Sequence, residues 1–293
     1  MFNQYRKEQF NRYNKSRDFF INDPERLIHI EHFCIDVLSE FIIKNHDEIK
    51  RDYNEASFLY PFWQNYPPDE RGRHPKGDQY PWIEVGEHVL CPKISRFLGD
   101  RFQVTDTGLP TGPDNRYIIS GRQLHAILSI TDSVWLFIDI KSVGPRDDQD
   151  HAVMSHNQIS GNGKWNSESY GVINDIMTAD GQRVSHPFHC AIPPLFVLSD
   201  GTIVPVVHIV LKPVYTMLGL VCEKRGQPLK RISIVSIPNG ILLAENPNYL
   251  QMHKGLLFPG KDDKEKDPRK IRARVSFTIL RQLDEWRCAD ISF

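Results

Sequence analysis

The run Val134-Trp135-Leu136-Phe137-Ile138-Asp139-Ile140-Lys141 joins β-branched and aromatic residues to one carboxylate near its end. Runs of this composition are typical of β-strands. A carboxylate at the end of an apolar strand is costly to bury unless another group pairs with it. We therefore predict a strand at 134–140 and consider Asp139 a candidate functional residue.

The segments on either side of this run predict a mixture of helix and strand. A helix is expected over 24–50, with Asp23 as N-cap, Pro24 as first helical residue and an apolar face for a core or a dimer surface. Residues 57–83 contain five prolines, which favours an ordered irregular loop. Further strands are predicted at 118–119, 195–198, 203–212, 231–237 and 272–279. We expect one α/β domain, residues 1–293, with a central mixed β-sheet flanked by helices.

The overall composition excludes few functions. The 293 residues carry a formal net charge of −1, so a nucleic-acid site would need basic residues gathered on one face. No export signal is evident, and the apolar run 203–222 contains two prolines, a histidine and a lysine, which favours buried strands over a membrane span. The five cysteines form no CxxC pair, which suggests reduced thiols in a cytoplasmic protein.

Two aspartates and a lysine form the candidate catalytic set. Asp114 follows Pro113 and precedes Asp139 by 25 positions, while Asp139 and Lys141 are two apart and so face one side of a strand. Phosphodiester hydrolysis needs hard oxygen ligands for Mg²⁺, which activates water, and a cation that steadies developing negative charge. Glu84 or Glu87 is a candidate further ligand, but their spacing of three lets only one face the site.

The same residues also have ordinary structural explanations. Asp114 fits a turn aspartate, and Asp139 with Lys141 fits a surface pair at a strand end. The Gly-rich segment SGNGKW at 160–165 lacks the sequence of a phosphate-binding Walker loop. His186, His189 and Cys190 suggest a zinc site, but no second pair at finger-like spacing accompanies them.

Long sequence blocks carry a resemblance to a known family. The chain resembles the BglI family of type II restriction endonucleases, within the PD-(D/E)XK nuclease superfamily, mainly between residues 52 and 276. The matching blocks are DYNEASFLYPFWQNYPP from Asp52, PKGDQYPWIEVGE from Pro75, GLPTGPDNRY from Gly108, DIKSVGPRD from Asp139, SGNGKW from Ser160, LSDGTIVPVVH from Leu198, FPGKDD from Phe258 and RARV from Arg272.

The resemblance implies a homodimeric, Mg²⁺-dependent enzyme that cuts double-stranded DNA at an interrupted GC-rich palindrome and leaves 3′ overhangs. Its catalytic residues fall on Asp114, Asp139 and Lys141, and we assign the metal to Asp114, Asp139, Glu87 and Ile140. Ca²⁺ is expected to replace Mg²⁺ without supporting cleavage, and Mn²⁺ is a candidate alternative. With the resemblance, a contact between the backbone of SGNGKW and DNA phosphates also becomes plausible.

The resemblance also implies a set of base-reading residues: Asp147, Lys261, Asp263, Arg272 and Arg274. Lysine and arginine donate to guanine O6 and N7, and aspartate accepts from cytosine N4. A site of the type GCCNNNNNGGC follows, together with a host methyltransferase that protects it. Two other hypotheses stay open: a nuclease for repair or junction cutting, and a DNA-binding protein on an inactive nuclease fold.

Overall fold

The computed structural model describes residues 2–55, 90–106, 115–143, 149–166, 171–172, 175–215, 229–260, 267 and 270–293. Several predicted features lie outside these residues: the loop at 57–83, Glu84, Glu87, Asp114, Asp147, Lys261 and Asp263.

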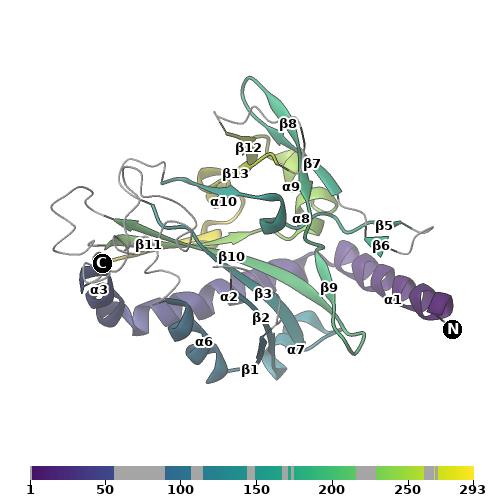
Figure 1. Cartoon of the computed structure of the whole chain (residues 1–293), viewed down its shortest axis with the longest axis horizontal. Helices are drawn as coiled ribbons and strands as arrows, with labels where there is room; N and C mark the ends of the chain where they lie inside the picture. Colours follow the sequence, from purple (N-terminus) through teal and green to yellow (C-terminus); the bar gives the residue numbers. More distant parts are fainter. Residues whose placement is uncertain are drawn as a thin grey trace, which may run out of the picture.

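A seven-stranded mixed sheet forms the centre of the molecule (Figure 1). Its order is β1-β2-β3-β10-β11-β14, and β9 also pairs with β10. The central strands β3 and β10 run parallel, while every other pair is antiparallel. This confirms the predicted mixed sheet. The strands are β1 (Gln103–Asp106), β2 (Asn115–Ser120), β3 (Ser133–Ile140), β9 (Leu195–Val197), β10 (Ile203–Tyr215), β11 (Leu229–Ile237) and β14 (Cys288–Ser292).

Smaller sheets lie outside the central sheet: β7, β8, β12 and β13 are grouped beyond one of its faces, and β5-β6 lies beside α1 (Figure 1). One has three strands in the order β12-β13-β4, and two are two-stranded, β5-β6 and β7-β8. Their bounds are β4 (His151–Met154), β5 (Trp165–Asn166), β6 (Gly171–Val172), β7 (Asp175–Asp180), β8 (Ser185–Cys190), β12 (Leu257–Pro259) and β13 (Ala273–Ser276). Lys212 of β10 is buried and donates a hydrogen bond to the carbonyl of His151 in β4, which ties the three-stranded sheet to the central one.

Helices flank the central sheet, and α1 projects away from it toward the N-terminus (Figure 1). None of the helices in the described residues is long and apolar enough to cross a membrane. The helices are α1 (Phe2–Asn22), α2 (Glu25–Lys44), α3 (His46–Glu55), α6 (Cys91–Gly99), α7 (Arg122–Leu128), α8 (Gly240–Ala244), α9 (Tyr249–Met252) and α10 (Phe277–Leu283), with 3₁₀ turns η4 (His156–Gln158) and η6 (Glu285–Arg287).

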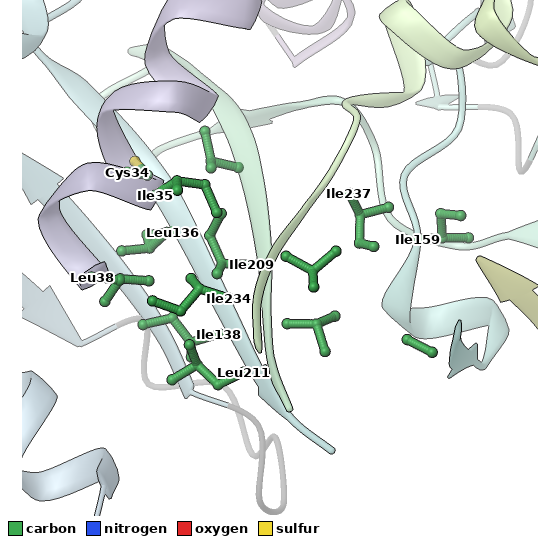
Figure 2. Close-up of a cluster of buried hydrophobic side chains, with 14 of the residues drawn as sticks. Cys34, Ile35, Leu38, Leu136, Ile138, Ile159, Ile209, Leu211, Ile234 and Ile237 are labelled. Carbon is green, nitrogen blue, oxygen red and sulfur yellow. The ribbon is translucent and has the colours of Figure 1, made fainter. Parts of the chain in front are cut away.

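Helix α2 covers the face of the central sheet opposite the three-stranded sheet. Figure 2 shows Cys34, Ile35 and Leu38 of α2 beside apolar side chains of β3, β10 and β11. Burying such side chains contributes roughly 1.5–3 kcal/mol each relative to exposure. The residues of this contact on the sheet are Leu136, Ile138, Ile209, Leu211 and Ile234.

The predicted helix over 24–50 is two helices. Helix α2 ends at Lys44, and Asn45 donates a side-chain hydrogen bond to the carbonyl of Phe41 before α3 starts at His46. Asp23 does not act as a side-chain cap, because its carboxylate accepts a hydrogen bond from Arg26 instead. The apolar face of α2 is buried within the chain, so of the two surfaces expected for this face, a core or a dimer surface, the structure shows the core.

Most predicted strands are confirmed, with small changes at their ends. The segments 118–119, 134–140, 195–198, 203–212 and 231–237 correspond to β2, β3, β9, β10 and β11. The prediction for 272–279 is half wrong, because β13 ends at Ser276 and α10 begins at Phe277. The hydroxyl of Ser276 accepts a hydrogen bond from the amide of Ile279 and so caps the helix.

Candidate active site

Strand β3 carries the candidate catalytic residues at its carboxyl end. Its residues alternate between two apolar clusters: Leu136 and Ile138 lie in the core under α2, while Trp135 and Phe137 lie in a second cluster on the other face. By this alternation Asp139 follows Trp135 and Phe137 on the second face. The carboxylate is thus placed near the carboxyl end of β3, on the face of the central sheet opposite α2.

Asp139 and Lys141 form an ion pair at this strand end. Lys141 Nζ lies 2.9 Å from Asp139 Oδ2, and the side chain of Asp139 is 2% exposed while that of Lys141 is 24% exposed. The predicted placement of the two side chains on one side is therefore confirmed. Neighbouring backbone bonds fix the segment, since the amides of Lys141 and Val143 donate to carbonyls of β10. A buried carboxylate beside a partly exposed ammonium can hold a cation or a charged substrate group.

The sheet face beside Asp139 carries two further basic side chains. Arg116 of β2 lies over the ring of Phe137, 4.7 Å from its centroid. His208 of β10 stacks on the same ring at 4.4 Å and 13°. Both residues are direct neighbours of Phe137 in the sheet register. The side chains of Arg116, Phe137 and His208, from the neighbouring strands β2, β3 and β10, therefore stack on one another. In β3 this stack lies two residues before Asp139.

His208 is buried, and neither ring nitrogen has a hydrogen-bond partner among the described residues. Burial, with the nearby charges of Lys141 and Arg116, lowers the pKa of His208 to about 3. The imidazole is therefore neutral in the folded protein at pH 7, and protonating it in place would add a third positive charge to this face.

His208→Phe is expected to make the protein less sensitive to acid. Between pH 6.5 and about 3 the unfolded chain binds a proton at His208 that the folded chain excludes, so stability falls as pH falls through this window. The slope is at most about 1.4 kcal/mol per pH unit. Thermal unfolding at pH 7.5 and pH 5, without divalent metal, measures the difference. Parallel losses in both proteins would show that His208 does not titrate in this way.

The two arginines of the predicted base-reading set lie at β13. Arg272 is exposed and directly precedes the strand, and Arg274 is half-buried within it. Residue Arg274 lies opposite Phe258 of β12 and Val153 of β4. Because the two arginines are two apart, they face one side of the three-stranded sheet. A cationic face suitable for a phosphate or a guanine is thus present on the smaller sheet.

The segment SGNGKW is packed into the protein. The hydroxyl of Ser160 accepts a hydrogen bond from the amide of Gly240, and Gly161 is buried against the same glycine. Arg17 of α1 donates to the carbonyl of Asn162, and Lys164 pairs with Glu245 at 3.1 Å. These contacts use the segment to join α1 to α8.

The histidines of the segment 186–190, for which zinc was not assigned, do not converge on one site. His186 and His189 are three apart on β8, so they lie on opposite faces of that strand. Among the described residues no three His, Cys, Asp or Glu side chains form a group that could hold a metal. Cys34, Cys91, Cys190 and Cys288, the cysteines in the described part of the chain, are not joined by disulfides.

Sequence reasoning missed Arg116 and His208 as neighbours of the site. They come from β2 and β10, which reach β3 only through long-range pairing. The prolines and charged residues of β10 were interpreted only as an argument against a membrane span. His208 and Lys212 are four residues apart, and this even spacing indicates that both side chains face the same side of a strand.

A central mixed sheet, with an Asp-x-Lys pair at the end of a central strand, defines the restriction-endonuclease-like class of folds. The chain matches the family model described as restriction endonuclease BglI over residues 8–291. It is 45% identical over 285 residues to the type II restriction enzyme BglI of Bacillus subtilis, covering 96% of this chain and 95% of that protein. The chain therefore belongs to the BglI family of restriction endonucleases.

Solved structures agree with this assignment. The crystal structure of the restriction endonuclease BglI bound to its DNA recognition sequence matches with a TM-score of 0.88 and 44% identity, covering 100% of this chain and 99% of that one. The tetrameric restriction endonuclease SfiI, bound to cognate DNA, matches with a TM-score of 0.58 and 13% identity, covering 92% of this chain and 85% of that one. The second match shows the fold alone.

Proposed function

We propose that this chain is a type II restriction endonuclease that hydrolyses phosphodiester bonds of double-stranded DNA with Mg²⁺. The observation that carries the proposal is the 2.9 Å contact between Lys141 Nζ and Asp139 Oδ2 at the end of a central strand. Membership of the BglI family gives the substrate class. We also place the reaction in the cytoplasm, where such an enzyme meets DNA.

The donor set suits magnesium. Asp139 is a buried carboxylate, which is a hard oxygen ligand of the kind that Mg²⁺ prefers. Asp114, outside the described residues, is covalently joined to Asn115, whose Cα partner Ile138 directly precedes Asp139. This adjacency supports Asp114 as a second ligand. We assign Glu87 and the backbone carbonyl of Ile140 as further ligands of the metal. When bound, the metal polarises the scissile phosphate and lowers the pKa of water.

Lys141 has the position and the charge to assist hydrolysis. Its ammonium is held beside the metal-binding carboxylate, yet the side chain is partly exposed and can reach a phosphate oxygen. A fixed cation there stabilises the negative charge that develops on the phosphate during attack. Arg116 adds positive charge on the same face of the sheet.

We further propose that Arg272 and Arg274 read guanine bases, together with Asp147, Lys261 and Asp263. Arg274 of β13 and Arg272, which directly precedes the strand, are two apart and face one side, and a guanidinium can donate two bonds to one guanine. Such a set suits a half-site of G·C pairs, so the proposed target is GCCNNNNNGGC, cut to leave 3′ overhangs. A host carrying this enzyme needs a methyltransferase that modifies the same site.

Arg272→Ala is expected to reduce cleavage of the proposed site by about 10- to 100-fold, because one bidentate guanine contact is worth about 1–3 kcal/mol. Affinity for unrelated DNA should change much less, since phosphate contacts dominate it. Cleavage rates and gel shifts with both kinds of DNA measure the two effects. Arg122→Ala, an exposed arginine on α7, is the control and should behave as wild type. Equal cleavage by Arg272→Ala and wild type would exclude base reading by Arg272.

We also propose a homodimer with two-fold symmetry. One chain supplies one Asp139/Lys141 site, and two strands of a palindrome need two such sites. The unspecified base pairs between half-sites follow from the fixed spacing of the two subunits. Sedimentation with and without a duplex bearing the site measures the assembly. A monomer that cuts both strands in one binding event would contradict the dimer.

Digestion of a plasmid of known sequence with Mg²⁺ tests the proposed function. Discrete bands whose ends map to GCCNNNNNGGC are expected. A smear would indicate a nonspecific nuclease, and intact plasmid would indicate a DNA-binding protein that does not cut. Either outcome overturns the proposal. Replacing Mg²⁺ by Ca²⁺ should leave binding intact and stop cleavage, and Mn²⁺ is the first substitute to test for activity.

A further inference from the structure

Gly260, which directly follows β12, lies against the guanidinium of Arg274. A Cβ added at Gly260 would lie 1.7 Å from Arg274 Nη1, 2.5 Å from Cζ and 2.7 Å from Nη2. These distances are far shorter than any normal contact of a Cβ. Glycine is therefore the only residue at this position that leaves the guanidinium where it is.

The sheet register explains this close approach. Pro259 lies opposite Ala273, and Phe258 lies opposite Arg274. Extended by one residue, the register places Gly260 opposite Arg272 and diagonal to Arg274. Side chains in these positions share one face and contact each other. Gly260 thus lies on the same face as the two arginines, and its missing side chain makes the space that the Arg274 guanidinium fills.

The end of β12 is held in place by contacts other than Arg274. A Cβ on Gly181, in the turn between β7 and β8, would lie 3.2 Å from the ring of Pro259, so this turn already packs closely on the strand. The ring of Phe258 also packs edge-to-face on His151 of β4, at 5.7 Å. A methyl group at position 260 would therefore displace the flexible end of Arg274 and leave the strand in place.

We propose that Gly260 is a positioning residue for DNA recognition, which fixes the direction of the Arg274 guanidinium by leaving room for it. The proposal rests on the proposed base reading by Arg274. A bidentate contact needs both nitrogens of the guanidinium aimed at one base edge, so orientation decides its strength. We assign Gly260 no direct contact with a base, and its effect on recognition comes only through the orientation of Arg274.

Gly260→Ala tests the proposal. Cleavage of GCCNNNNNGGC should fall about 10- to 100-fold, as for the loss of one bidentate contact, while affinity for unrelated DNA and the Tm stay near wild type. Gly99→Ala is the matched control, because a Cβ there meets nothing within 4 Å, and it should cut at the wild-type rate. In the Arg274→Ala background, Gly260→Ala should add little, because the two substitutions act on one contact.

Each alternative result has a distinct meaning. If Arg274→Ala cuts its site as fast as wild type, base reading by Arg274 fails. If Arg274→Ala loses specific cleavage but Gly260→Ala does not, the positioning role alone fails. Equal losses from Gly260→Ala with and without Arg274 also overturn it. If Gly260→Ala proves unstable, Arg274→Ala should restore its Tm by removing the clash, and failure to do so rejects the contact.

Discussion

Asp139→Asn is expected to lower the rate of DNA cleavage by about 10²- to 10³-fold while the protein keeps its fold and its affinity for DNA. The change removes the charge from the buried carboxylate that we assign to the metal and to Lys141. A single preorganised electrostatic contact is commonly worth about 10²–10³ in rate. Most DNA affinity comes from phosphate and base contacts elsewhere, so gel shifts in Ca²⁺ should still show binding.

The Tm separates this effect from a loss of structure. Asp139 is buried and its partner Lys141 can turn toward solvent, so the asparagine variant should be as stable as wild type or more so. Asp132→Asn provides the control, because Asp132 is exposed just before the other end of the same strand. It should cut at the wild-type rate. Cleavage by Asp139→Asn within tenfold of wild type would remove Asp139 from the catalytic set.

The central strands could be predicted because their sequence carries the reason for their burial. Residues 134–140 and 203–212 are apolar and rich in β-branched side chains, and they form the adjacent strands β3 and β10. Helix α1 was not predicted, because its buried side chains include polar ones. Gln9 and Arg17 are buried in α1 beside Tyr13 and Phe20, and the partners of Arg17, Asn162 and Glu245, come from distant parts of the chain.

The candidate site also has one part that the local sequence predicts and another part that it does not. Asp139 and Lys141 are two apart on one strand, so local geometry predicts their contact. The layer of Arg116 and His208 around Phe137 depends on how three strands align, which local sequence does not determine. The apolar face of α2 shows the same limit. Its spacing predicts a buried helix but cannot distinguish the chain's own sheet from a second subunit.

The buried pair Glu31–Arg287 has no local sequence pattern either, since 256 positions separate its members. Arg287 Nη1 lies 2.7 Å from Glu31 Oε2, and both side chains are almost fully buried. Glu31 also accepts a hydrogen bond from the amide of Asn239, so one carboxylate joins α2 to the start of α8 and to η6. Burial raises the pKa of Glu31, against the opposing effect of the Arg287 guanidinium.

Glu31→Ala is expected to lower the free energy of unfolding by about 3–5 kcal/mol, because it leaves the guanidinium buried without its main partner. Urea unfolding followed by circular dichroism measures the loss. Asp36→Ala is the matched control on the same helix, because Asp36 pairs with His32 in an exposed contact and should cost under about 1 kcal/mol.

The double variant Glu31→Leu/Arg287→Met tests whether the stability lost in Glu31→Ala comes from leaving the Arg287 charge buried alone. An apolar pair of similar size removes both charges together, so it should recover most of the stability that Glu31→Ala loses. DNA cleavage by the double variant should stay near the wild-type rate, because the pair joins α2 to η6, and α2 lies on the face of the sheet opposite Asp139. If Glu31→Ala cost no more than Asp36→Ala, the pair would contribute nothing beyond a surface contact. Apolar packing alone would then hold α2 against α8.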